Sequence, residues 1–438
     1  MLDLRERLKG LDETPAPDLR GIIQRRARRL SDSGAAERAF DERWPSRRRY
    51  RLGLNELLAA AAVLALAIGL AMFARYARTH GPVKHQPSPL PSGGLRASMR
   101  MIDASIGWVS IGPNPTAVFR NAATYDMSWF DVTPRDAGSG SELIPAFVDD
   151  ATAWVVSVPT SVPSSGTADV WRTANAGRSW QQLARLSVTP WYTGVRRPDR
   201  LVFVDRHNGW LTVKISSSTG LSMVIYRTSD GGVNWTEVSV PSGIPGHSTP
   251  GAIPPGCIGE LTFTSALDGW VPAACPQGNH LFSSHDGGRT WSRQTFAGQA
   301  SMAIGEVPHF ESPVRVSGSA GFLYFMWGAA ARSILYVSRD HGDSWSALSL
   351  PASPVPDLTP PMFVRENGWF VTSVGLYRTT DGGHRWEKIN AATDGWIPSE
   401  LQFVDAKTGW ALASRTGRLG IIRTTDGGWT WFLSWQSP

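Results

Sequence analysis

Three groups of residues in this 438-residue chain could do chemistry. They are six carboxylate or amide side chains, two cysteines, and a few aromatic and cationic residues. The nine histidines include no HExxH motif and no pair at metal-ligand spacing. The chain also has no GxSxG nucleophile elbow and no GxxxxGK phosphate loop. The sequence therefore predicts neither a metal site nor a cofactor, and it places the remaining chemistry on side chains whose positions depend on the fold.

The six carboxylate and amide side chains belong to one repeated string, Ser/Thr-x-Asp/Asn-x-Gly-x-x-Trp. They are Asn175, Asp230, Asp286, Asp340, Asp381 and Asp426. A looser copy ends at Trp129, and a second string of the type FVDxxxGW precedes most copies by roughly twenty residues. Such regular recurrence indicates a repeat architecture over residues 97–438.

Each repeat divides into four short segments with the alternation and β-branched residues of strands. In the third copy these segments are residues 201–204, 210–214, 222–227 and 235–238. Four strands per repeat of this length describe the blade of a β-propeller. We therefore predict an all-β fold with seven four-stranded antiparallel blades. No spare strand follows the last repeat, so closure is expected to rest on packing between blades.

Within the string, the hydroxyl and the carboxylate can accept backbone N–H groups in the turn between strands three and four, and the Trp can pack against the core. This string is similar to the Asp-box, or BNR repeat. The pairing of FVDxxxGW with RTTDGGxxW most resembles the photosystem II assembly/stability-factor type of propeller, with sialidases and sortilin-like ectodomains more distant. The resemblance implies that the box residues are structural and lie away from any ligand site.

The sialidase resemblance supplies an enzymatic alternative, an exo-sialidase-like glycoside hydrolase. Such enzymes use a Tyr nucleophile, and the resemblance adds an arginine triad. Most of the eight Tyr occupy repeat positions or flank the apolar segment, which leaves Tyr192 and Tyr324. The early Phe-Arg-Ile-Pro string of that family is absent, and this departure favours a non-enzymatic protein.

Cys257 and Cys275 flank the first hairpin of the fourth repeat, and the midpoint between them falls in its turn. They would face one another across two strands. A disulfide bond there would suit a domain outside the cytoplasm, and two buried thiols are the alternative.

The connections between strands two and three and between successive blades vary in length, whereas the other turns repeat regularly. Variable loops on a rigid scaffold are common binding sites. Their non-repeat aromatic and cationic residues form the candidate ligand-binding set, with packing onto the rim as the alternative: Trp191, Tyr192, Arg196, Arg197 and Trp396.

Residues 57–73 are seventeen consecutive residues without a charge, which is the lower end of a membrane-spanning length. More Arg precedes than follows this run, which predicts a cytoplasmic N-terminus. The expected organisation is a basic cytoplasmic tail (1–51), a transmembrane helix (52–76), a Pro/Gly/Ser-rich stalk (77–96) and an extracytoplasmic propeller (97–438).

Residues 1–51 contain 14 Lys and Arg against 9 Asp and Glu, so the tail supplies five of the six net positive charges. The propeller is nearly neutral, which argues against a nucleic-acid partner. These features predict a membrane-anchored, monomeric propeller without catalytic activity, which binds a protein or a cell-surface polymer such as a glycan or assists the assembly of a membrane complex. Transmembrane signalling through the basic tail is a further alternative.

Overall fold

The computed structural model describes residues 96–112, 117–121, 128–137, 141–159, 167–187, 196–217, 220–244, 248–296, 309–310, 313–315, 323–329, 332–348, 361–372 and 375–436. The predicted tail, membrane helix and almost all of the stalk lie outside these residues. Within them, no helix is long and apolar enough to cross a membrane. The chain divides into two units, Met1–Val83 and Lys84–Pro438, and every described residue belongs to the second.

The described residues of the second unit form seven antiparallel sheets. Sheet 1 contains β1 (Arg96–Met101), β2 (Gly107–Gly112), β3 (Ala117–Asn121) and β4 (Trp129–Asp131), and is followed by a short 3-10 helix, η1 (Arg135–Ala137). Sheet 2 contains β5 (Ser141–Phe147), β6 (Ala153–Pro159), β7 (Thr167–Thr173) and β8 (Gln181–Ser187). Sheet 3 contains β9 (Arg196–Phe203), β10 (Gly209–Ser217), β11 (Gly220–Thr228) and β12 (Thr236–Ser239).

Sheets 4 to 7 complete the described fold. Sheet 4 contains β13 (Ile258–Gly259), β14 (Thr262–Phe263), β15 (Gly269–Cys275), β16 (Gly278–Ser284) and β17 (Ser292–Arg293). Sheet 5 contains β18 (His309–Phe310), β19 (Val314–Arg315), β20 (Leu323–Ala329), β21 (Arg332–Ser338) and β22 (Ser346–Leu348). Sheet 6 contains β23 (Met362–Val364), β24 (Asn367–Thr372), β25 (Gly375–Thr379) and β26 (Glu387–Ile389). Sheet 7 contains β27 (Ile397–Phe403), β28 (Gly409–Arg415), β29 (Arg418–Thr424) and β30 (Phe432–Gln436).

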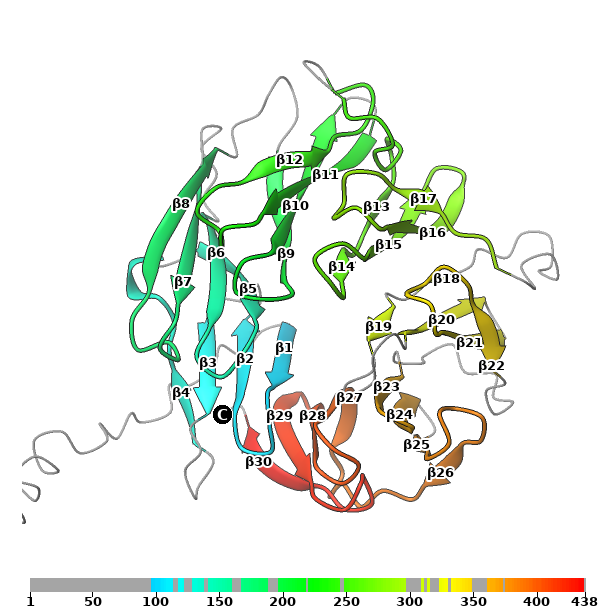
Figure 1. Ribbon diagram of the computed structural model, residues 1–438. Coiled ribbons are helices and arrows are strands. Elements are labelled where there is room, and N and C mark those ends of the chain that lie inside the picture. The colour runs from blue at the N-terminus through cyan, green and yellow to red at the C-terminus, as the bar shows by residue number, and fades with distance from the viewer. Residues whose placement is uncertain are drawn as a thin grey trace, which may run out of the picture. The chain divides into compact units, whose positions relative to one another are not determined.

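The sheets follow one another around a ring, and β1, β5, β9, β14, β19, β23 and β27 lie nearest its centre (Figure 1). This arrangement is an all-β propeller, as the repeats predicted. Two sheets depart from the expected four strands, because β13 and β14 both pair with β15, and β18 and β19 both pair with β20. In sheet 4 the break between β13 and β14 lies opposite Pro272 of β15, which has no N–H to donate to the inner strand. Gly259 allows the two backbones to approach closely there, because a Cβ would lie 2.1 Å from the Pro272 carbonyl oxygen.

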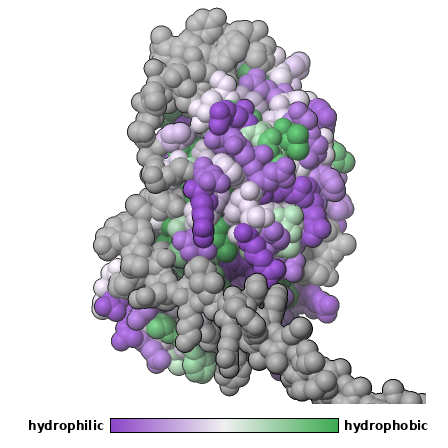
Figure 2. All heavy atoms as spheres, turned by 90° about the vertical axis from the view of Figure 1, so that its left-hand side faces the viewer, coloured by the Kyte–Doolittle hydropathy of each residue, from purple (hydrophilic) through white to green (hydrophobic). Residues whose placement is uncertain are grey.

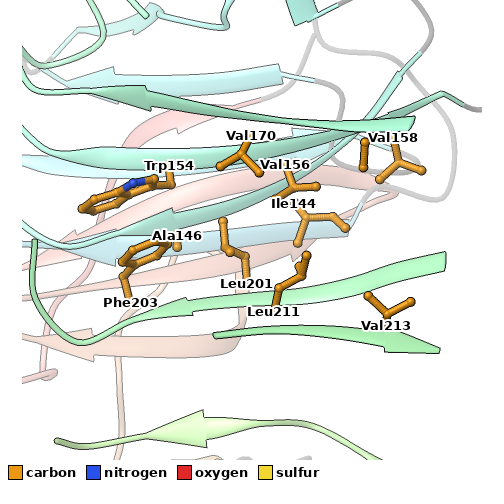
Figure 3. Close-up of a cluster of buried hydrophobic side chains, with 11 residues drawn as sticks. Ile144, Ala146, Trp154, Val156, Val158, Val170, Leu201, Phe203, Leu211 and Val213 are labelled. Carbon is orange, nitrogen blue, oxygen red and sulfur yellow. The ribbon is translucent and has the colours of Figure 1, made fainter. Parts of the chain in front are cut away.

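The core lies between neighbouring sheets. At the seam of sheets 2 and 3, aliphatic side chains of β5, β6 and β7 pack against those of β9 and β10 (Figure 3). Trp154 at the start of β6 is fully buried, and its ring stacks on Phe203 of β9 with centroids 3.9 Å apart. The same stacking joins Trp210 to Phe263 and Trp369 to Phe403. These Trp residues therefore join neighbouring sheets, which accounts for part of the high Trp content of the sequence.

The outer strands are mostly solvent-facing. In β8, for example, every residue is exposed or half-buried. The side of the molecule that carries β7 and β8 is accordingly mostly hydrophilic, with small scattered hydrophobic patches (Figure 2).

The ring closes between sheets 7 and 1 without exchange of a strand, because β1–β4 and β27–β30 form separate sheets. A hydrophobic cluster fills this seam, with Met99 and Met101 of β1 against Trp410 and Leu412 of β28. Closure by packing between sheets, as predicted from the absence of a spare strand, is confirmed.

Candidate functional site

The repeated box is a self-contained turn, which sheet 3 illustrates. The Thr228 hydroxyl donates to Asp230 Oδ1 (2.8 Å) and accepts the Gly232 N–H (2.9 Å). Asp230 Oδ1 also accepts the Asn234 N–H at 3.0 Å, and the Trp235 indole N–H donates to the Gly232 carbonyl at 3.0 Å. Gly232 has φ +97°, which a residue with a side chain rarely adopts. These bonds pair the side-chain polar groups of the box within its own turn.

The pKa values of the box aspartates agree with this hydrogen bonding. Hydrogen bonds, led by the one from the Asn234 backbone N–H, lower the pKa of Asp230 to about 2. Those from Ser344, with the side-chain bond the largest, lower the pKa of Asp340 to about 2. The equivalent bond to the threonine or serine two residues earlier is present at Asn175, Asp286, Asp381 and Asp426. All six residues accept hydrogen bonds within their own turns, which accounts for their recurrence in the repeat.

Cys257 and Cys275 form a disulfide bond in sheet 4, as predicted. Cys257 is buried against the apolar seam of sheets 3 and 4, beside Ile253 and Leu261. The bond ties the segment before β13 to the end of β15, and it does not form part of a site.

The five residues proposed from the variable loops have different positions. Trp191 and Tyr192 lie outside the described residues. Arg196 is the first residue of β9, but only its backbone is described. Trp396 is 4% exposed and packs on Gly420, where a Cβ would lie 2.5 Å from the indole ring. This corrects the expectation that the Trp396 side chain belongs to a contact surface, because the missing side chain at Gly420 provides its pocket.

Arg197 is the member of that set that the structure brings to other charged residues. Its guanidinium forms an ion pair with Glu142 of β5, on the inner strand of the preceding sheet, and the Arg197 side chain is 56% exposed. Arg200, three residues further along β9, pairs with Glu260 at 3.0 Å, and Glu260 lies between β13 and β14. The inner strands of sheets 2, 3 and 4 are thus linked by two solvent-accessible ion pairs.

A fifth charged residue, Glu400, joins this group from β27 of sheet 7. Burial raises the pKa of Glu400 to about 7, although a hydrogen bond from the Met99 N–H and the Arg200 guanidinium act in the opposite direction. The charge of Arg200 on β9 of sheet 3 acts on Glu400, which is why Glu400 is grouped with the two ion pairs. We call these five residues the inner-strand cluster: Glu142, Arg197, Arg200, Glu260 and Glu400.

The inner-strand cluster presents guanidinium donors beside carboxylate acceptors, and burial raises the pKa of one of its carboxyl groups, that of Glu400, to about 7. Such a set can hydrogen-bond the hydroxyl groups of a ligand, and a carboxylic acid near neutrality can act as a proton donor. Within the described residues, no group of three or more His, Cys, Asp or Glu side chains is arranged to hold a metal ion. The sequence revealed only Arg197 of this cluster, since the others sit in strands without a distinguishing motif.

No protein-family model and no curated protein matches the sequence. The structure is similar to the GH74 xyloglucanase from Xanthomonas campestris, with 17% identity, a TM-score of 0.48, and 77% of this chain and 56% of that chain covered. It is also similar to the Hadza microbial sialidase Hz136 (12%, 0.38, 67% and 65%) and to a PL25 ulvan lyase (13%, 0.43, 78% and 94%). The chain spans less than two thirds of the length of the xyloglucanase and of the sialidase. At such identities the similarity concerns the β-propeller fold alone.

Proposed function

We propose that this chain is a membrane-anchored, extracytoplasmic propeller, with each of its seven sheets as one blade, that binds a hydroxyl-rich polymer such as a glycan. The observation that carries the proposal is the pair of exposed ion pairs, Arg197 with Glu142 and Arg200 with Glu260, across the inner strands of three consecutive sheets. Nothing in the repeat requires charges at these positions, whereas the box residues are accounted for by the turns.

A glycan fits this chemistry better than a protein partner. Arginine and carboxylate groups side by side offer donors and acceptors to sugar hydroxyls, and Arg200 and Glu260 are 41% and 71% exposed. Protein interfaces usually centre on exposed aromatic residues. Trp396 is buried, and the exposed Trp429 and Phe432 lie at the outer edge of sheet 7 rather than on the inner strands. The resemblance of the repeats to assembly-factor propellers favours a role in binding, and a wild-type protein that binds no glycan in the test below would favour a protein ligand.

The membrane anchor and the extracytoplasmic location rest on the sequence and on the disulfide. Residues 57–73 have the length and composition of a short membrane span, and disulfides persist in oxidising compartments. A thiol-reactive, membrane-impermeant label tests the topology. A cysteine placed at Ser292 on outer strand β17 should be labelled in intact cells, and one placed at Ser33 in the tail should be labelled only after lysis.

A glycan array probed with the purified protein tests the binding proposal. Binding should fall at least tenfold in Arg200→Ala and Arg197→Ala, because each variant removes guanidinium donors from the inner-strand cluster. Arg185→Ala is the matched control, since Arg185 forms a comparable exposed ion pair with Asp169 on the outer strands of sheet 2. Equal binding by all three variants, or binding of the wild-type protein to no glycan on the array, would overturn the proposal.

Glycoside hydrolysis is the second candidate function, and one observation favours it. The Glu400 carboxyl, with a pKa of about 7, is suited to protonate a leaving group, as the general acid of a glycoside hydrolase does. Reducing ends released from a bound glycan by the wild-type protein, and absent with Glu400→Gln, would establish this activity. Binding without release in both proteins would leave the binding function alone.

A further inference from the structure

The seam that closes the ring lacks an indole hydrogen bond that is present in three other seams. In three seams the indole N–H of a buried Trp donates to a box carbonyl of the next sheet: Trp154 to Gly231, Trp210 to Gly287 and Trp369 to Gly427. The equivalent residue of sheet 7, Trp410, is fully buried, and its Nε1 has no hydrogen-bond partner in the described part of the chain. Other groups form the hydrogen bonds that brace sheets 7 and 1, among them Arg423, whose Nη2 donates to the Ala104 carbonyl at 3.4 Å.

Two side chains of β27 add to this brace by binding the main chain of β1. Gln402 Oε1 accepts the Met101 N–H at 2.6 Å, and Gln402 Nε2 donates to the Met99 carbonyl. Glu400 accepts the Met99 N–H. Glu400 and Gln402 thus hold three consecutive main-chain groups on the inner edge of β1, and we call this arrangement the clamp.

We propose that the clamp keeps the ring closed, and in this sense acts as its latch. The seam between sheets 7 and 1 then loosens when Glu400 loses its proton. The neutral carboxyl group keeps an oxygen that accepts the Met99 N–H and carries no charge to be solvated. The ionised group is partly shielded from water in the closed seam, and opening the seam relieves this desolvation.

Burial of Glu400 determines the direction of this effect, and the surrounding charges reduce its size. Arg200 on β9 favours the ionised form, but Arg200 is itself neutralised by Glu260. On β1, Arg100 lies between the two clamped methionines, and its pKa is lowered by burial. Burial outweighs the opposing effects of Arg200 and of the Met99 hydrogen bond, since the pKa of Glu400 rises from 4.5 to about 7.

The pH dependence follows from linkage. A group whose pKa is higher in the closed state than in the open state stabilises the closed state at low pH. For Glu400 this stabilisation is complete below about 4.5 and is lost as the pH rises through about 7. With allowance for solvent screening, we expect the open population of the seam to rise roughly tenfold or more between pH 5.5 and 8.5.

Hydrogen–deuterium exchange of the full-length protein tests the latch directly. After correction for the intrinsic pH dependence of exchange, the amides of Met99 and Met101 should lose protection by roughly tenfold or more between pH 5.5 and 8.5. In Glu400→Gln this loss should disappear. Glu142→Gln is the matched control, because it alters a carboxylate in the seam of sheets 2 and 3, and it should behave as the wild-type protein does at β1.

The same pH dependence in Glu400→Gln as in the wild type would overturn the inference, as would pH-independent protection in the wild type. If Glu400→Gln does not fold, the wild-type protein provides the second measurement. Protection should then fall with rising pH at Met99 and Met101 but not at Gly231, whose N–H bonds the His207 carbonyl within sheet 3. A parallel loss at all three amides would contradict a latch located in the closing seam.

Discussion

The indole nitrogen of Trp154 donates a hydrogen bond to the main-chain carbonyl of Gly231, 2.7 Å away and 77 residues further along the chain. Gly231 belongs to the box of the next sheet, so the box serves the preceding sheet as an acceptor as well as closing its own turn. An arginine of the same sheet, Arg172, lies over the Trp154 ring with its guanidinium carbon 5.2 Å from the ring centroid. The repeat therefore encodes the joint between sheets as well as the sheets themselves.

This relationship predicts that the indole N–H stabilises the seams in which it has an acceptor. Trp210→Phe should reduce the free energy of unfolding by about 1–3 kcal/mol more than Trp410→Phe. Both residues are fully buried, so both variants lose similar packing. Only Trp210 has a carbonyl partner, at Gly287. Denaturant unfolding of both variants measures the difference, and equal losses would show that the bond adds nothing to stacking.

The disulfide should stabilise the fold, because it restricts the unfolded chain by closing a loop, with an effect that increases slowly with loop length. The sequence separation of Cys257 and Cys275 is 18 residues. For a loop of that size we expect a contribution of about 2–4 kcal/mol. The double variant Cys257→Ser/Cys275→Ser should therefore unfold at lower denaturant concentration than the wild type. A reducing agent should destabilise the wild type and leave the double variant unchanged, and a wild type insensitive to reduction would refute the expectation.

The boxes predict a loss of stability in acid. Asp230 and Asp340 have pKa values lowered to about 2 in the folded state, against a model-peptide value of 3.8. Such groups stabilise the fold above about pH 4, and the stabilisation disappears as the pH falls toward 2. Asn175 occupies the same position in sheet 2 and accepts the Ser179 N–H at 3.0 Å, so asparagine fits the turn. Asp230→Asn/Asp340→Asn should flatten the decline of the unfolding midpoint between pH 4 and 2, and an unchanged decline would exclude these boxes as its source.

The strands and turns could be predicted from the sequence because their determinants are local. The hydroxyl, carboxylate, glycine and tryptophan of a box lie within eight residues, and their bonds are made within the same turn. The division of the inner strand in sheet 4 was not predicted, because it depends on a proline in the neighbouring strand. The burial of Trp396 was missed for a similar reason, since its pocket is created by Gly420 on another strand.

The inner-strand cluster could not be predicted because its members meet only when the ring is complete. Arg197 and Glu142 are 55 positions apart in the chain, and Arg200 and Glu260 are 60 apart. Glu400 reaches Arg200 only because sheet 7 lies across the ring from sheet 3 (Figure 1). Which charges converge at the centre of a propeller is decided by sheet order and by the position of each residue along its inner strand.

Exchange of the two charges in the Arg200–Glu260 pair tests the proposed ligand site most directly. The double variant Arg200→Glu/Glu260→Arg keeps an ion pair between sheets 3 and 4 and reverses the order of donors and acceptors that a ligand meets. We expect its unfolding midpoint to stay close to that of the wild type and its affinity for the bound glycan, measured by calorimetry, to fall at least tenfold. Unchanged affinity in a stably folded double variant would contradict the assignment of the inner-strand cluster as the binding site.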